Sequence, residues 1–282
     1  MEAQTTLANA PSLEERAYRI RRNALLMGEV QGQGYIAQAL GVADVLAVSY
    51  FHALRYRPED PYWEDRDRFL LSIGHYAIAL YAVLIEAGIV PEHELETYGS
   101  DDSRLPMSGM ASYTPGMEIS GDSLGIGLGI AVGIGLGLRR KGSDRFVYNL
   151  MSDGELDEGP TWEAAMSAGH WGLGNLICIV DVNRMQADGP STGVLNFEPL
   201  LPKWEAFGWH AQRVDGNDID ALVHAFDTAR ALTDKKPRVI ICDTKMAKGV
   251  PFLETRDKAH FIRVEKDEWQ PAIEALGAGR NA

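Results

Sequence analysis

Runs of apolar residues with two different periods divide the chain into predicted helices and strands. Ser12 and Glu15 have the spacing of a capping box, a hydroxyl followed three residues later by a carboxylate, so a helix is predicted after Ser12. A second helix is predicted over about residues 38–54. The apolar run at 67–72 predicts a short strand, and the run that follows predicts a helix ending near Gly88.

The second half of the chain alternates runs of Val, Ile and Leu with helical patterns. Strands are predicted at 145–151, 175–182, 209–214 and 238–243, and helices at about 157–170 and 218–232. Such strands are buried on both faces, which indicates a parallel sheet covered by helices. We therefore predict an α/β fold with a doubly wound, mostly parallel sheet and helices on both faces. With no repeat or low-complexity linker, we expect one domain over 1–282, with its core at about 15–265 and irregular ends.

The stretch from Leu124 to Leu138 is uncharged and rich in glycine, at positions 125, 127, 129, 133, 135 and 137. It is shorter than the ~20 residues that cross a bilayer. We predict a buried helix whose small side chains let another backbone approach closely. A dinucleotide-binding glycine loop is a weaker alternative, because no strand precedes these glycines.

Composition and charge narrow the classes of partner. The chain has 282 residues, of which 45% are hydrophobic, enough for a substantial core. The formal net charge of −13 argues against nucleic acid or an anionic membrane as the main partner, although one local site can still bind a small anion. Cys178 and Cys242 lie in apolar runs, and the N-terminus lacks a hydrophobic signal core, so we expect buried free thiols and a cytoplasmic location.

Two predicted strands end in polar residues that favour metal binding. The strand 145–151 leads into Asp153 and Gly154, and the strand 175–182 leads into Asn183. If one right-handed crossover joins these strands, both ends emerge at the same edge of the sheet, where ligands of open α/β sheets bind. Carboxylate and amide oxygens suit Mg²⁺ or Ca²⁺, and Gly154 leaves room for a phosphate at a helix start. The alternative is a pair of ordinary turn residues.

Residues 152–183, SDGELDEGPTWEAAMSAGHWGLGNLICIVDVN, resemble the thiamine diphosphate motif, which opens with Gly-Asp-Gly and closes with Asn. Asp153 and Asn183 are separated by 183 − 153 = 30 positions. The stretches RDRFLLSIGHYAIALYAVL, TPGMEISGDSLGIGLGIAVG and KWEAFGWHAQRVDGND resemble the amino-terminal part of transketolases. The resemblance covers about residues 15–265 and implies the pyrophosphate-type domain of the thiamine diphosphate-binding fold.

The resemblance also implies roles for individual residues. The metal ligands would be Asp153, Asn183 and the main-chain carbonyl of Met185. The cofactor would contact His75, Asp122, Ser123, Leu124, Asp153, Gly154, Asn183 and His260. Glu158 and Glu163 match acidic residues at the subunit contact of the family. The catalytic candidates are His260, Glu158 and Gln33.

The chain departs from the transketolase pattern at two histidines. The family's His-Pro-Gly is replaced by Gln33-Gly34-Tyr35, and a second histidine aligns near Gly109. Glutamine forms hydrogen bonds but is no acid or base near neutral pH, and glycine offers only backbone and space. The ordinary ketose phosphate substrates are therefore in question. Tyr35, Ile36, Met107 and Met110 suggest a roomier and more apolar acceptor pocket, or simply core packing.

The family's second domain has no counterpart in this sequence. In transketolases a glutamate on the pyrimidine-binding domain activates the cofactor, and only about seventeen residues follow residue 265, too few for a domain. We therefore expect a split enzyme, in which a second subunit carries the glutamate and two copies of each chain form an α2β2 heterotetramer.

Three functions remain open from the sequence. The first is a transketolase-like transferase of carbohydrate metabolism, active only with its partner, that moves a two-carbon ketol unit from a ketose-type donor to an aldehyde. The second is the α-subunit of a thiamine-dependent 2-oxo acid decarboxylating or carboligating enzyme. The third is a non-catalytic assembly or regulatory partner, which the two missing histidines favour.

Overall fold

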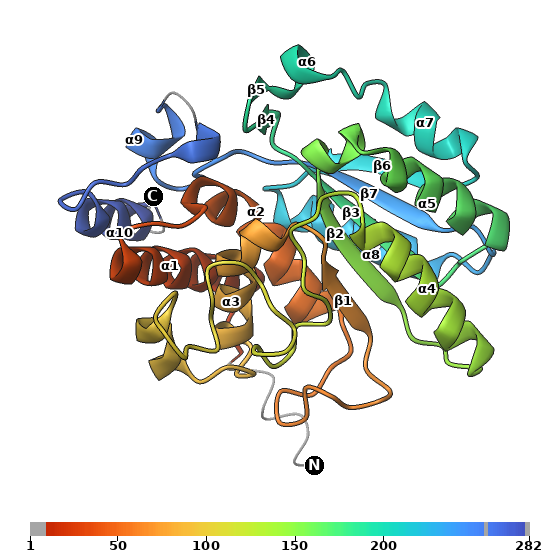
Figure 1. Cartoon of the computed structure of the whole chain (residues 1–282), viewed down its shortest axis with the longest axis horizontal. Coiled ribbons are helices and arrows are strands. Elements are labelled where there is room, and N and C mark those ends of the chain that lie inside the picture. Colours follow the sequence, from red (N-terminus) through yellow and green to blue (C-terminus); the bar gives the residue numbers. More distant parts are fainter. Residues whose placement is uncertain (1–9, 257–258, 280–282) are drawn as a thin grey trace.

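A five-stranded parallel sheet forms the centre of the computed structural model, which describes residues 10–256 and 259–279 (Figure 1). Its strand order is β1-β2-β3-β7-β6, and every neighbouring pair is parallel. The strands are β1 (Arg68–Leu71), β2 (Val147–Ser152), β3 (Leu176–Val182), β7 (Arg238–Asp243) and β6 (His210–Asp215). The predicted parallel α/β fold is therefore confirmed, and all five predicted strands are present.

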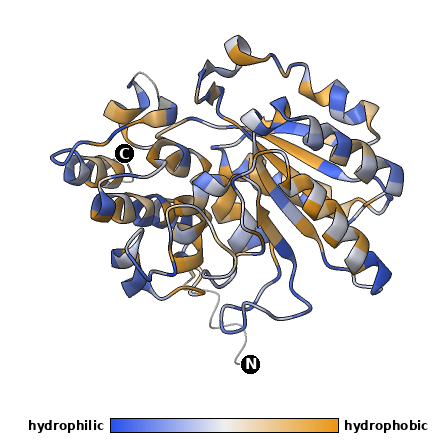
Figure 2. Ribbon diagram, in the orientation of Figure 1, coloured by the Kyte–Doolittle hydropathy of each residue, from blue (hydrophilic) through white to orange (hydrophobic). Residues whose placement is uncertain are grey.

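Helices cover both faces of the sheet, as predicted for a doubly wound fold. One face packs against α1 (Leu13–Gln31), α2 (Ile36–Val48), α3 (Ala77–Glu86) and α8 (Ile219–Ala231). The other packs against α4 (Gly127–Arg140), α5 (Gly159–Trp171) and α7 (Leu200–Ala206). Adjacent residues Leu150 and Met151 belong to different cores, because side chains alternate across a strand. Figure 2 shows the strands as mainly hydrophobic between amphipathic helices.

The N-terminal elements follow the sequence pattern closely. The Ser12 hydroxyl accepts a hydrogen bond from the Glu15 amide at 3.2 Å, so α1 begins where the capping residues predict. The predicted helix at 38–54 starts at Ile36 and ends in a π-helical turn, η2 (Ser49–Ala53). The span Ile36–Ala53 is apolar and long enough to cross a membrane by length and composition, but 89% of it is buried inside the fold.

The C-terminal end is helical rather than irregular, which corrects our expectation. Helix α10 (Trp269–Ala278) packs against α1, and Trp269 is 2% exposed. Gly28 makes this contact possible, because a Cβ at Gly28 would lie 2.8 Å from the Trp269 ring. The sequence pattern missed this helix because its ten residues carry a single short apolar stripe. The last three residues lie outside the described part of the chain.

The glycine-rich helix α4 is buried on only one face, which corrects the prediction of a buried helix. Leu128, Ala131 and Leu138 pack against the sheet and α5. The opposite face is exposed and carries Gly129, Ile130, Gly133 and Gly137, with Ile130 at 38% exposure. A Cβ at any of these three glycines would meet nothing within 4 Å in this chain. The small residues therefore leave a bare, apolar helix surface.

The two cysteines are buried free thiols, as predicted. Burial raises the pKa of both Cys178 and Cys242, so neither is a ready nucleophile.

We expect opposite effects from adding one methyl group at two helical glycines. A Cβ at Gly169 in α5 would lie 1.9 Å from the carbonyl oxygen of Phe207. Gly169→Ala should therefore lower the free energy of unfolding by roughly 1–3 kcal/mol. Gly133→Ala, the matched control, should raise it by about 0.5–1 kcal/mol, because alanine favours the helix and meets no neighbour there. Urea unfolding of the two variants checks this, and equal stabilities would contradict the packing described here.

Candidate cofactor and metal site

The ends of β2 and β3 bring together the two residues that the sequence proposed as metal ligands. These strands are parallel neighbours, and Ser152 lies opposite Asp181. Asp153 and Asn183 therefore follow at the same edge of the sheet, as predicted. The main-chain amide of Arg184 donates a hydrogen bond to Asp153 Oδ2 at 2.9 Å, which joins the two strand ends directly.

Asp153 is a buried carboxylate, 1% exposed, without a basic partner in an ion pair among the described residues. Its Oδ2 also accepts a hydrogen bond from the hydroxyl of Ser191 at 2.8 Å. Burial raises the pKa of Asp153 to about 7, the negative charge of Asp181 adds to the rise, and the hydrogen bond from Ser191 opposes it. A cation beside this carboxylate would offset the cost of burying its charge.

The turn after β3 is held by its own hydrogen bonds. Asn183 Oδ1 accepts from the Met185 amide at 3.0 Å, and Asn183 Nδ2 donates to the Tyr76 hydroxyl at 2.8 Å. Arg184 lies between them in the left-handed region, at φ 66°. The chain then forms a short antiparallel hairpin of β4 (Met185–Gln186) and β5 (Gly189–Pro190), which returns Ser191 to Asp153.

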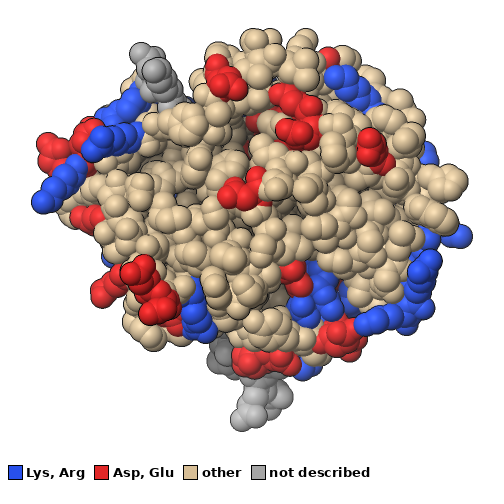
Figure 3. Space-filling view, in the orientation of Figure 1, with Lys and Arg blue, Asp and Glu red and all other residues tan. Residues whose placement is uncertain are grey.

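A cavity of about 370 Å³ lies at this edge of the sheet. Asp122, Asp153, Asp157, Glu158 and Asp188 line it, and no Lys or Arg of the described residues does. On the face shown in Figure 3, Asp and Glu gather around the hollowed centre, whereas Lys and Arg lie mainly at the periphery. A cation at this edge of the sheet would reduce the repulsion between a diphosphate and these carboxylates.

The predicted cofactor residues contribute unequally to this cavity. His75, Leu124, Gly154 and Met185 line it, as do His260 and the carboxylates Asp122, Asp153 and Glu158. Ser123 and Asn183 do not line it, although each is adjacent to a residue or turn that does. Gly154 lies in a 3-10 turn, η5 (Asp153–Asp157), and not at the start of α5 as the sequence suggested. A Cβ on Gly154 would meet nothing closer than 3.7 Å, so the backbone there is open to a ligand.

Two histidines from distant segments face this cavity. Their rings lie 6.0 Å apart, between centroids, and the ring of Tyr35 lies 4.6 Å from His75 and 5.8 Å from His260. Burial lowers the pKa of His75 to about 4, with His260 adding to the effect and Asp122 opposing it. Burial also lowers the pKa of His260, opposed by a hydrogen bond to the main chain of Met185. Both imidazoles are therefore neutral at pH 7, each with one donor and one acceptor nitrogen.

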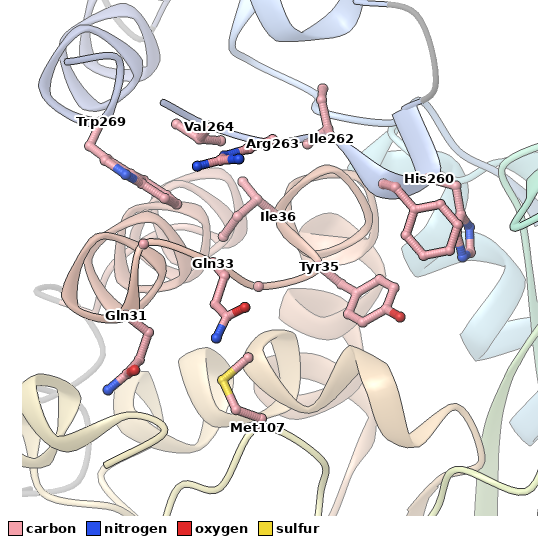
Figure 4. A pocket seen from close by; sticks show the side chains of 13 residues that line it. Gln31, Gln33, Tyr35, Ile36, Met107, His260, Ile262, Arg263, Val264 and Trp269 are labelled. Carbon is pink, nitrogen blue, oxygen red and sulfur yellow. The ribbon is translucent and has the colours of Figure 1, made fainter. Parts of the chain in front are cut away.

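A second, larger cavity of about 580 Å³ adjoins the first and shares Tyr35, His260 and Phe261 with it (Figure 4). Buried Ile36, Ile262, Val264 and Trp269 form its apolar side, together with half-buried Met107. Gln31, Gln33 and Arg263 supply polar groups around them. Figure 4 shows the Tyr35 ring beneath His260, with its hydroxyl pointing away from the centre of this cavity.

These positions revise several sequence-based assignments. Gln33 lines the second cavity and not the first, and Tyr35 is the residue of its segment that contacts the histidines. Glu163 is exposed on α5 and lines neither cavity. Met110, one of the four residues assigned to an acceptor pocket, also lines neither.

Gly109 lies directly beside the flexible side chain of Met117. A Cβ there would lie 2.1 Å from the terminal methyl of Met117. A side chain at this position would therefore require the terminal methyl of Met117 to move.

Three residues that shape the site were not predicted from the sequence. Tyr76 and Asp181 hold the amide of Asn183, and Ser191 holds the carboxylate of Asp153. Asp181 had a signal, because it is the only charged residue within an otherwise apolar strand. Ser191 had no such signal in the sequence, because it reaches Asp153 only through the geometry of the β4–β5 hairpin.

No group of three or more His, Cys, Asp and Glu side chains suited to a metal occurs within residues 10–256 and 259–279. This finding excludes a metal cage built wholly from such side chains there.

Comparisons with known proteins identify the chain's relatives. Residues 15–281 match the family described as "Transketolase, thiamine diphosphate binding domain". A transketolase family protein of Sinorhizobium fredii is 76% identical over 271 residues, covering 96% of this chain and 97% of its own length. A 6-deoxy-6-sulfo-D-fructose transketolase subunit of a Clostridium species is 36% identical, covering 94% and 96%. An apulose-4-phosphate transketolase subunit of Actinobacillus succinogenes is 37% identical, covering 94% and 95%.

Solved structures give the same result. The transketolase of Campylobacter jejuni has a TM-score of 0.87 and 31% identity, over 94% of this chain but 42% of its own length. The transketolase of Leishmania mexicana has a TM-score of 0.81 and 28% identity, over 97% and 46%. The chain thus spans less than half of these transketolases and nearly all of the subunit-type relatives.

We expect the stability of the ligand-free chain to depend on pH through Asp153. Its folded pKa of about 7 lies above the ordinary value of 3.8, so the folded chain binds the extra proton. The stabilisation is complete below the unfolded pKa and is lost as pH rises through about 7. Asp153→Asn should therefore reduce the fall in melting temperature between about pH 5 and pH 8.

The control for this experiment is Asp188→Asn, which alters an exposed carboxylate of the same cavity. Differential scanning calorimetry of the two variants and the parent chain provides the comparison. A parent-like pH dependence in Asp153→Asn would show that this carboxylate does not titrate as described.

Proposed function

The chain belongs to the transketolase family, and on this premise we propose that it is the cofactor-binding subunit of a two-component transketolase. With its partner it would transfer a two-carbon ketol unit from a ketose-type donor to an aldehyde acceptor. Its binding of thiamine diphosphate follows from the family match over residues 15–281. The metal, the reaction of this chain and its assembly are our proposals.

The hydrogen bond between Asp153 and the Arg184 amide is the observation that carries the proposal, because it joins two strand ends at one ligand site. Asp153, Asn183 and the Met185 carbonyl would hold Mg²⁺ or Ca²⁺, and the metal would neutralise the diphosphate. The raised pKa of Asp153, about 7, supports a cation there. The absence of Lys and Arg from the described lining of this cavity supports it further, because no other positive charge faces the diphosphate.

When bound, thiamine diphosphate supplies a carbanion at its thiazolium ring that adds to a carbonyl group. The residues of this chain would position the substrate around that ring. His260 and Tyr35 line both cavities, and the ring of His75 lies 4.6 Å from that of Tyr35 and 6.0 Å from that of His260. A neutral imidazole can accept a proton from a substrate hydroxyl at one nitrogen or donate a hydrogen bond to it from the other. Glu158, exposed at the rim, would face the partner.

We place the acceptor in the second cavity. Tyr35 borders this cavity with its ring, while its hydroxyl points away from the centre of the cavity and stays protonated, because burial and Asp122 raise its pKa. Gln33 and Arg263 offer hydrogen bonds, beside the apolar wall of Ile36 and Trp269. The mixture suits an acceptor with fewer hydroxyl groups than an ordinary sugar phosphate.

The proposed partner would carry the pyrimidine-binding domain and the activating glutamate, in a cytoplasmic α2β2 assembly. Two relatives named as subunits, and the coverage of less than half of single-chain transketolases, support a second polypeptide. The exposed face of α4 supports it as well, since a glycine-rich surface permits close packing of another chain.

Replacing Asp153 by Ala tests the function. In the complex with its partner, Asp153→Ala should lose thiamine diphosphate binding and ketol transfer by at least about 100-fold, because the metal loses its only carboxylate ligand. Calorimetric titration with thiamine diphosphate and Mg²⁺, and assays with ketose, sulfonated, deoxy and keto-acid donors, provide the measurements. Asp188→Asn serves as the control. Unchanged activity would support a non-catalytic chain, and CO₂ release from a keto acid would support a decarboxylating enzyme instead.

A bulky residue on the bare face of α4 tests the partner surface. Gly133→Leu should leave the isolated chain folded, because a Cβ there meets nothing within 4 Å. It should prevent assembly with the partner, because the close approach that glycine permits is lost. Size-exclusion chromatography with light scattering measures both. Normal assembly of Gly133→Leu would place the partner elsewhere, and Gly277→Ala in α10, where a Cβ would meet nothing closer than 3.8 Å, controls for a general effect of losing a glycine.

A further inference from the structure

Asp181 is a buried carboxylate that the proposed chemistry does not use. It lies in the central strand β3, is 1% exposed, and forms no ion pair with a described residue. Its Oδ2 accepts hydrogen bonds from the Tyr76 hydroxyl at 3.0 Å and from Asn183 Nδ2 at 2.9 Å. Its Oδ1 accepts from the Thr244 hydroxyl at 2.5 Å. An apolar residue would fill this position in a parallel sheet at lower cost.

These contacts fix which way the side-chain amide of Asn183 faces. Asp181 is surrounded by three donors, and Tyr76 has committed its proton to Asp181, so its oxygen accepts from Asn183 Nδ2 at 2.8 Å. Rotating the amide by half a turn would place Oδ1 against two acceptor oxygens. The amide nitrogen is therefore held on this side, and Oδ1 faces the Met185 amide and the turn beside Asp153.

We propose that Tyr76 and Asp181 are positioning residues for the divalent metal: they hold the Asn183 amide so that its oxygen, and not its nitrogen, faces the ion. The inference rests on the proposed function, because the metal at Asp153 and Asn183 belongs to it. An amide free to rotate would present its NH₂ group to the cation part of the time and bind it more weakly.

The contacts come from three separate segments, which argues for a role at the site. Tyr76 ends the 3-10 turn η3 (Gly74–Tyr76), Asn183 follows β3, and Thr244 follows β7. All three reach Asp181 at the strand ends where the cofactor cavity lies. Tyr76 also lines that cavity itself, directly after His75.

The first experiment reads the amide orientation without metal or cofactor. In the full-length chain, the side-chain NH₂ protons of Asn183 should exchange slowly with water by NMR, since both are held in hydrogen bonds. Tyr76→Phe and Asp181→Asn should accelerate this exchange. Two matched controls should not. Tyr148→Phe removes a buried hydroxyl without a partner, and Asp67→Asn alters a buried carboxylate that accepts from the main chain at the opposite end of the strands.

The second experiment measures Mn²⁺ binding by electron paramagnetic resonance in the presence of thiamine diphosphate. Tyr76→Phe and Asp181→Asn should weaken Mn²⁺ binding by about 10–100-fold, the range seen when groups that orient metal ligands are lost. The two control variants should bind Mn²⁺ like the parent chain. Circular dichroism establishes that every variant is folded.

The outcomes separate this inference from the proposed function. If Asp153→Ala loses Mn²⁺ while folded Tyr76→Phe and Asp181→Asn bind it normally, the positioning role is wrong and the metal site stands. Fast exchange of the Asn183 amide in the parent chain also overturns the positioning role. If the parent chain binds no Mn²⁺, or Asp153→Ala binds it normally, the proposed metal site fails, and the inference fails with it.

Discussion

The carboxylate of Asp153 is buried at the end of a parallel strand with only hydrogen-bond donors to hold it. The Arg184 amide and the Ser191 hydroxyl both donate to one of its oxygens, and neither brings a full positive charge. Burying a carboxylate in this way is costly in a folded chain, and the cation that we propose beside it would offset that cost. The surrounding fold produces this arrangement. Strands β2 and β3 end side by side, Arg184 turns the chain in a left-handed conformation, and the β4–β5 hairpin brings the Ser191 hydroxyl back to Asp153.

Much of the fold could be predicted because its determinants are local. Strands of continuous apolar residues and helices between them specify a covered parallel sheet, whatever the loops do. The spacing of Asp153 and Asn183 was sufficient to place both at one edge, since the β2–α5–β3 unit fixes their relation. Helix α10 and the half-exposed face of α4 could not be predicted, because which face a helix buries depends on neighbours that the sequence pattern does not contain.

The sequence pointed to the residues that we propose as ligands, but not to the groups that hold them in place. Asp153, His75 and His260 belong to recognisable motifs, but Ser191 reaches Asp153 only through the geometry of a two-stranded hairpin. The same limit explains Gln33 and Tyr35. Alignment alone put the hydrogen-bonding role on Gln33, whereas the turn between α1 and α2 directs the ring of Tyr35 toward the histidines. The sequence does not contain the direction of each side chain, and this direction decides whether Gln33 or Tyr35 faces the histidines.

The two sides of the paired cavities differ in how many hydrogen bonds hold them to the sheet. Glu155, fully buried, accepts hydrogen bonds from the Gly125 amide at 3.0 Å, the Ser152 amide at 3.1 Å and the Ser72 hydroxyl. One carboxylate thus connects three segments at the sheet edge: the loop at Gly125, the end of β2 and the residue after β1. The opposite side is formed by the α1–α2 turn, Met107 and the segment at 260–264. Glu155 makes none of these hydrogen bonds to that side. Exchanges of Ile36, Met107 or Val264, which line the second cavity but not the first, would therefore leave the hydrogen bonds of Glu155 intact.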